Sequence, residues 1–180
     1  MKPQPLMSGV ALLEALVALG LLAWVLTGLL TLQLRSTVDS QLAAQRVLAT
    51  RLAQDLFERI KANPGGPSVL QAYLTPLDKP GNSVGQRADC RAQPCGPQAL
   101  AAWDLDQWLQ QVARDLPLGR AIVFLPEGAP GQVGVLLGWR AHEATAEADY
   151  RTPLSVSALS GGASLTCPER LICQLLYSTP

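Results

Sequence analysis

A single carboxylate, Glu14, stands inside a long apolar run of the sequence. It is the one charged residue between Val10 and Leu34, where the other polar side chains are two threonines and one glutamine. As a helix with a rise of about 1.5 Å per residue, this run is long enough to cross a bilayer core of about 30 Å. An ionised carboxylate in a membrane helix costs roughly 2.5–3.5 kcal/mol and normally has a partner. Because no Lys, Arg or His lies within one helical turn of Glu14, we expect its partner to come from another chain or to be created by processing.

Four cysteines fall in two closely spaced pairs, Cys90 with Cys95 and Cys167 with Cys173. Structural zinc sites usually have two residues between paired ligands, whereas four and five residues lie between these. The positive-inside rule places the start of the chain in the cytoplasm and the later residues beyond the membrane, in an oxidising compartment that favours disulfides. Three connectivities are possible, and we expect the two local bridges because each intervening loop is short and contains a proline.

Residues typical of enzymes are scarce. The one histidine, His142, falls in a polar stretch and is interpreted as a surface residue. The pair Gly161-Gly162 predicts a turn, with no following helix to present backbone amides to a phosphate. Lys+Arg and Asp+Glu count 14 each, which gives no basic field to attract nucleic acid. The sequence therefore predicts a protein that is not an enzyme, needs no cofactor or metal, and binds no nucleic acid.

The apolar run continues into an amphipathic helix. Over residues 38–60, apolar side chains recur within a stripe of roughly 140° around the helix. The opposite side is polar apart from Val47 and Phe57, which indicates that part of that side contacts another subunit. Residues 63–67, Asn-Pro-Gly-Gly-Pro, cannot continue a helix.

The rest of the chain predicts a second helix and a small sheet. The helix would cover residues 98–116, with Trp108 in its apolar face and Trp103 on the other side, either as an exposed contact or as a cover over the preceding loop. Strands over 120–125 and 133–139 would form a hairpin, and a last strand would cover 170–177. Three or more antiparallel strands against the amphipathic helix would bury both apolar faces. The predicted class is α+β, a long N-terminal helix packed on a small antiparallel sheet.

The start of the chain resembles the type III signal of type IV pilin-like proteins. In that pattern a glycine, here Gly9, is followed at the fifth place by a glutamate, here Glu14, although Val10 stands where phenylalanine is usual. The resemblance implies that a prepilin peptidase cuts between Gly9 and Val10, methylates the new amine of Val10, and lets it pair with Glu14 of a neighbour to set the assembly register. It also implies a leader over 1–9, a transmembrane half-helix over 10–34, an amphipathic half-helix over 35–63, and a periplasmic globular domain over 64–180.

Two later segments are similar to minor pilins of the PilV type, also named type IV pilus modification proteins. One is the helix end at residues 52–64, and the other runs from Asp89-Cys90 to residues 101–108. The resemblance implies a minor pilin that crosses the inner membrane once, keeps its C-terminal domain in the periplasm, and is then built into the fibre or its tip. Its partners would be other minor pilins and a tip adhesin, in a complex that primes assembly.

Two other functions stay open. A minor pseudopilin of a type II secretion system shares the signal and the architecture, although the helix end and the cysteine-bearing middle favour the pilus. A single-pass anchored periplasmic binding module that never polymerises would tolerate substitution of Gly9 and Glu14. An ordinary secretory signal peptide would have a shorter apolar core of about 7–15 residues.

Overall fold

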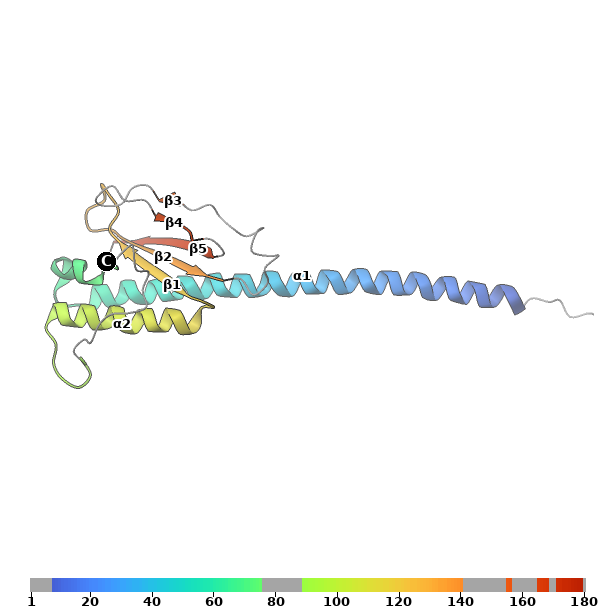
Figure 1. Cartoon of the computed structure of the whole chain (residues 1–180), viewed down its shortest axis with the longest axis horizontal. Helices are drawn as coiled ribbons and strands as arrows, with labels where there is room; N and C mark the ends of the chain where they lie inside the picture. The colour runs from blue at the N-terminus through green and yellow to red at the C-terminus, as the bar shows by residue number, and fades with distance from the viewer. Residues whose placement is uncertain (1–7, 76–88, 141–154, 157–164, 169–170, 180) are drawn as a thin grey trace, which may run out of the picture. The chain divides into compact units, whose positions relative to one another are not determined.

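Helix α1 (Ser8–Ala62) is the first element of the described part of the chain, which comprises residues 8–75, 89–140, 155–156, 165–168 and 171–179 of this computed structural model. The elements that follow it are drawn in Figure 1. They are the 3₁₀-helix η1 (Gly66–Tyr73), helix α2 (Pro97–Asp115) and strands β1 (Arg120–Phe124), β2 (Val133–Trp139), β3 (Ser155–Val156), β4 (Leu165–Thr166) and β5 (Ile172–Ser178). Contacts divide the chain into two compact units, residues 1–42 and 43–180, and α1 runs through the boundary.

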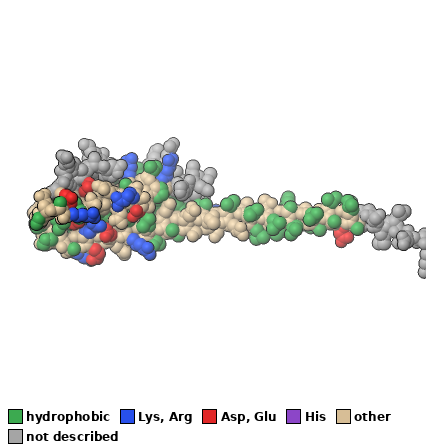
Figure 2. Space-filling view, turned by 90° about the horizontal axis from the view of Figure 1, so that it is seen from below, with side chains coloured by type: hydrophobic (Ala, Val, Ile, Leu, Met, Phe, Trp, Pro, Cys, Tyr) green, Lys and Arg blue, Asp and Glu red, His purple; other side chains and the backbone are tan. Residues whose placement is uncertain are grey.

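The first unit contains the apolar part of α1. Over residues 12–34 its large apolar side chains are exposed, and Trp24 is 84% exposed. Figure 2 shows these side chains along the helix. The hydroxyls of Thr27 and Thr31 donate to backbone carbonyl oxygens three or four residues earlier, at 2.7–2.8 Å, so they are satisfied within the helix. Among the described helices, α1 is long and apolar enough to cross a membrane by length and composition, and its most apolar window is not buried.

In the second unit, strands β1, β2 and β5 form an antiparallel sheet in the order β1-β2-β5. The predicted hairpin joins β1 to β2. In the register of the sheet, Phe124 lies opposite Gly134, and Gly134 lies opposite Tyr177. The rings of Phe124 and Tyr177 meet edge to face, with centroids 6.0 Å apart. A Cβ at Gly134 would collide with the Phe124 ring, so only glycine leaves room for this aromatic pair.

Both faces of this sheet are covered. All seven residues of β2 are buried, which fits a central strand between two layers. One face meets α1, where the Gln174 side-chain amide donates to the Thr50 hydroxyl oxygen at 2.9 Å. The other face carries an apolar cluster formed by Ile122, Phe124, Leu136, Leu165, Leu171 and Cys173. The predicted α+β fold, a long helix packed on a small antiparallel sheet, is confirmed.

Of the two apolar residues on the polar side of α1, only Val47 stays exposed for the predicted contact of part of that side with another subunit. Phe57 is only 6% exposed within this chain, while Val47 stays 52% exposed. Phe57 comes seven residues after Thr50, so both project from the same side of the helix. Because Thr50 is bonded to Gln174 of β5 and Phe57 is buried, the buried surface of α1 extends further around the helix than the apolar stripe alone predicted.

Helix α2 packs on another side of α1 and runs in the opposite direction (Figure 1). The Trp108 indole Nε1–H donates to the Leu52 carbonyl oxygen at 2.7 Å, and Asp104 Oδ1 lies 3.6 Å from Arg59 Nη1. Residues later in α2 therefore lie beside residues earlier in α1, so the two helices are antiparallel. Trp108 is fully buried, as predicted.

Candidate functional site

The N-terminal site residues lie at the start of α1. Gly9 and Val10 belong to its first turn, and the residues before Ser8 lie outside the described part of the chain. Glu14 is exposed in the next turns of the helix. None of the ion pairs found among the described residues includes Glu14. This arrangement presents one carboxylate to the surroundings of an apolar helix; cleavage, methylation and registry remain predictions.

A second group of polar residues lies in the second unit, where the end of α1 meets η1 and α2. It is named the junction cluster and has four members: Arg59 of α1, Asn63 directly after α1, Tyr73 of η1 and Asp104 of α2. The Tyr73 hydroxyl donates to Asp104 Oδ2 at 3.3 Å, and it accepts a hydrogen bond from Asn63 Nδ2 at 3.2 Å. Arg59 lies beside Asp104 and also bonds Asp55 Oδ2 through Nε at 2.8 Å.

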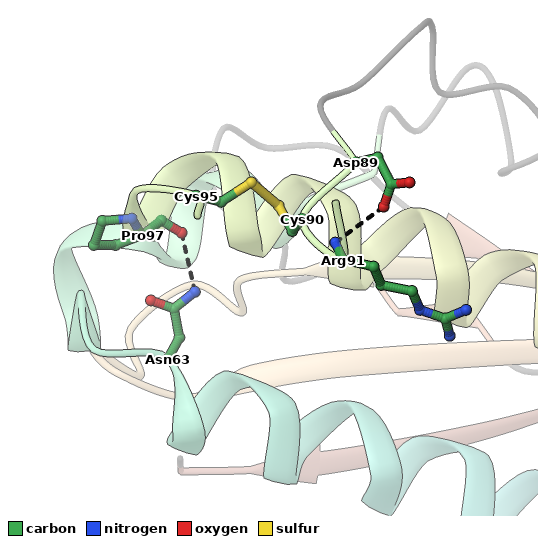
Figure 3. Close-up of a disulfide and its surroundings, with 6 residues drawn as sticks. All are labelled: Asn63, Asp89, Cys90, Arg91, Cys95 and Pro97. Carbon is green, nitrogen blue, oxygen red and sulfur yellow. Dashed lines mark hydrogen bonds between the residues drawn. A yellow bond between two sulfur atoms is a disulfide. The ribbon is translucent and has the colours of Figure 1, made fainter. Parts of the chain in front are cut away.

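Asn63 connects the helix end to both neighbouring elements. Its Nδ2 also donates to the Pro97 carbonyl oxygen at 3.0 Å, and its Oδ1 accepts from the Gly65 amide at 2.9 Å. The next glycine, Gly66, has φ 53°, a left-handed conformation that suits glycine. Figure 3 shows the Asn63 side chain pointing at Pro97, the first residue of α2. The stop in α1 is thus also the point where α2 is attached.

Asn63, Tyr73 and Asp104 of the junction cluster are buried and Arg59 is half-buried, and burial governs the pKa values of Tyr73 and Asp104. Tyr73 is fully buried, and this burial, with Asp104 nearby, raises the pKa of its hydroxyl from 10.0 to about 12, against the lowering effect of the hydrogen bond from Asn63. Burial also raises the pKa of the Asp104 carboxyl, although Arg59 and the Tyr73 hydroxyl oppose the rise. Every charged or polar member has a partner, as buried polar groups require. The cluster can hold α1, η1 and α2 together, because its polar groups are hydrogen-bonded or ion-paired with one another.

The first disulfide joins Cys90 to Cys95 in the loop before α2, with their Cα atoms 5.4 Å apart. Within this loop, the Asp89 carboxylate accepts a hydrogen bond from the Arg91 amide at 2.9 Å (Figure 3). The Arg91 guanidinium lies 5.5 Å from the centre of the Trp103 ring, a cation–π contact. Trp103 is half-buried, and this contact agrees with the alternative that it covers the loop.

The second disulfide joins Cys167, just after β4, to Cys173 in β5, with their Cα atoms 5.9 Å apart. The two bridges are the local ones that the sequence predicted. All four cysteines of the chain are therefore bonded, and none is a free thiol nucleophile. Among the described residues, no group of three or more His, Cys, Asp and Glu could hold a metal ion. His142 and the Gly161-Gly162 turn lie outside the described residues.

Sequence reasoning missed the junction cluster. Asn63 was interpreted only as part of a helix stop, and no role was assigned to Asp104. A signal was nevertheless present, because Asp104 comes three residues after Ala101 and four before Trp108, which places a carboxylate beside the apolar stripe of α2. An acid at such a position predicts a buried partner. The identity of that partner could not be read from spacing.

Residues 31–106 match a protein family described as Tt1218-like, type IV pilin Tt1218. This part of the chain is similar to a type IV pilin. The match covers less than half of the chain, and it includes η1, the first disulfide and every residue of the junction cluster. No curated protein and no solved structure matches the chain. The similarity supports a pilin subunit that assembles with other pilus components.

Proposed function

We propose that this protein is a minor pilin, a structural subunit of a type IV pilus that is first held in the inner membrane by α1. One observation carries the proposal: an exposed apolar stretch with a single carboxylate near its start leads into a helix packed on a small antiparallel sheet. The similarity of residues 31–106 to a type IV pilin supports it. The role is structural, and the chain is the substrate of a processing enzyme.

In this proposal, a prepilin peptidase cuts between Gly9 and Val10 and methylates the new N-terminal amine of Val10. That amine supplies a cation for Glu14, which belongs to none of the ion pairs found among the described residues. In a fibre core it pairs with Glu14 of a neighbouring subunit, because an unpaired carboxylate in apolar surroundings is costly. One axial register between subunits is thereby favoured over registers in which Glu14 would have no cation beside it.

The second unit lies in the periplasm in this proposal, where an oxidising environment suits its two disulfides. Its partners are other minor pilins and a tip adhesin, in a complex that primes assembly before the subunit enters the fibre or its tip. The resemblance of residues 52–64 and 89–108 to PilV-type minor pilins supports these partners. The junction cluster contributes by fixing the end of α1 against η1 and α2, so that the subunit enters the complex as a rigid body.

The experiment that tests processing is the intact mass and N-terminal peptide of the protein extracted from its native membrane. A chain that begins at N-methylated Val10 is the expected result. A chain that retains Met1, or one cut after Leu34, would refute the pilin proposal and leave an anchored or secreted disulfide domain.

Glu14 tests assembly separately from folding. Glu14→Ala is expected to abolish incorporation into sheared pili while the protein stays in the membrane with both disulfides formed. The matched control is Thr27→Ala, which changes a polar residue of the same apolar stretch whose hydroxyl is satisfied within its own helix. Absence of both Glu14→Ala and the wild type from sheared pili would support a non-polymerising anchored module, whereas equal incorporation of both would refute the assembly role of Glu14. Loss of protein secretion without loss of pili would instead indicate a type II secretion pseudopilin.

A further inference from the structure

One end of the second unit presents three exposed arginines around an exposed leucine. Leu118 is 63% exposed. Its backbone also has φ 51°, a conformation that strains a leucine. Arg114 lies in the last turn of α2, Arg120 begins β1, and Arg140 directly follows β2; all three are exposed. These four residues are named the basic rim.

Backbone hydrogen bonds fix the position of the rim. The Gly119 amide donates to the Leu116 carbonyl oxygen, and the Arg140 amide donates to the Pro117 carbonyl oxygen, both at 2.9 Å. Arg120 pairs in register with Gly138, two residues before Arg140. The turn from α2 to β1, which carries Leu118, is therefore held by backbone hydrogen bonds at the end of β2, next to Arg120 and Arg140.

The rim lies at the end of the second unit where the chain enters from the apolar stretch. Because α2 runs antiparallel to α1 in this unit, the C-terminal end of α2 lies level with the first residues after position 42. Residues 35–42 separate Leu34 from this point. They span about 13 Å as a helix and at most about 30 Å fully extended, so a membrane around residues 10–34 stays within reach of the rim.

The described charges of the second unit are unevenly divided between its ends. The rim end has its three arginines and Arg46, in the first turn of α1 within this unit, against the carboxylate of Asp115. The opposite end includes the loop between β1 and β2, the end of α1 and the start of α2. Its described carboxylates are Asp55, Glu58, Asp89, Asp104, Asp106 and Glu127, and its described cations are Arg59, Lys61 and Arg91. The rim end has four cations and one carboxylate, and the opposite end has three cations and six carboxylates. The rim end is thus the cationic end, which is complementary to an anionic surface.

We propose that the basic rim binds the surface of the membrane that holds α1, with Leu118 among the lipid headgroups and the three arginines on lipid phosphates. The inference rests on the membrane anchor of the proposed function, and it adds a second contact with the bilayer. An apolar side chain surrounded by cations is the arrangement that binds anionic membrane surfaces. Such a contact would orient the second unit before assembly and would have to break when the subunit leaves the membrane for the fibre.

The test is hydrogen exchange, followed by mass spectrometry, on the full chain in nanodiscs. One set of discs contains phosphatidylcholine alone, and the other contains phosphatidylcholine with about a third phosphatidylglycerol. Amides of residues 114–120 are expected to exchange more slowly in the anionic discs. Each arginine near an anionic surface strengthens the contact about fivefold, so three together are worth about a hundredfold in the contact equilibrium. Peptides from 11–34 should be protected in both kinds of disc.

The key variant combines Arg114→Gln, Arg120→Gln and Arg140→Gln. It is expected to remove the lipid-dependent protection of residues 114–120. The matched control combines Arg51→Gln, Lys61→Gln and Arg91→Gln, which lowers the net charge equally, away from the rim, and should keep the protection. Leu118→Gly removes the apolar side chain at a φ that glycine prefers, so it should weaken the contact without destabilising the unit.

Each outcome decides the proposal. Equal exchange of residues 114–120 in both lipids, while 11–34 stay protected, overturns the membrane contact and leaves the pilin proposal intact. Protection that appears only with two chains per disc, in either lipid, assigns the rim to a second copy and also overturns it. Exchange of 11–34 at the rate of an unprotected chain instead refutes the membrane anchor itself, and with it the proposed function.

Discussion

Removing the Tyr73 hydroxyl, by Tyr73→Phe, tests the junction cluster directly. The substitution keeps the buried ring and deletes one oxygen that donates to Asp104 and accepts from Asn63. Asn63 keeps its bond to the Pro97 carbonyl oxygen, so its amide is not left without a partner. Asp104 loses a donor but keeps Arg59 at 3.6 Å. The main loss is therefore one hydrogen bond to a charged, buried acceptor.

The change in the free energy of unfolding caused by Tyr73→Phe has a value at neutral pH and a part that depends on pH. A hydrogen bond to a charged group contributes about 1.5–3 kcal/mol, so Tyr73→Phe should lower the free energy of unfolding by about 2 kcal/mol near pH 7. The Tyr73 pKa rises from 10.0 to about 12 on folding, and two pH units correspond to about 3 kcal/mol. The folded state then holds the proton more tightly than the unfolded state. The stability that Tyr73 contributes is complete below pH 10 and is lost as the pH rises towards 12.

The assay is urea unfolding of the full chain in detergent micelles, monitored by tryptophan fluorescence, for wild type and Tyr73→Phe. The difference in unfolding free energy should shrink as the pH rises from 10.0 towards about 12. Ultraviolet absorbance of tyrosinate provides a second readout. The tyrosinate signal that Tyr73→Phe removes should have its midpoint near pH 12 and not near pH 10.0, because burial raises the pKa of Tyr73. A stability difference that stays constant with pH, or a Tyr73 hydroxyl that ionises near pH 10.0, would falsify the prediction.

Three further substitutions have expected outcomes. Asp104→Asn should lower the free energy of unfolding more at acid pH than at pH 7, because burial raises the pKa of the Asp104 carboxyl. The stability that this carboxyl contributes is complete below pH 3.8 and is lost as the pH rises through its pKa in the folded state. Unfolding curves between about pH 4 and pH 7 check the direction of the change. Gly134→Val should destabilise by about 1–3 kcal/mol because its side chain collides with the Phe124 ring, and an unchanged unfolding midpoint would contradict this. Trp108→Phe should cost about 1–3 kcal/mol through the lost bond to the Leu52 carbonyl and the void left by the smaller ring, as measured by thermal unfolding.

Much of the fold follows from local patterns in the sequence. The apolar stretch, its isolated Glu14, the amphipathic half of α1 and the stop after Ala62 all depend on residues close together in the chain. Helix α2 and the β1–β2 hairpin follow from periodicity and turn residues in the same way. These features could be predicted because hydrophobic period and backbone restriction act within a few residues.

The second unit shows what local patterns could not decide. Phe57 interrupts the polar side of α1, and local spacing did not predict that it would be buried within the chain. β5, more than a hundred residues later, contacts α1 through the bond between Gln174 and Thr50. The partners of Asn63 and Asp104 come from elements that are distant in sequence, and so does the backbone hydrogen bond from Arg140 that holds the turn carrying Leu118.

The division between the two kinds of information has a physical cause. By itself, the sequence determined where an apolar surface must form and where one carboxylate lacks a cation, because the cost of exposing or burying a group depends on its own chemistry. Which surface covers a given face, and which donor reaches a given acceptor, depends on how separate elements pack. Packing is set by long-range contacts that no short stretch of sequence contains, so these pairings were decided by the tertiary structure alone.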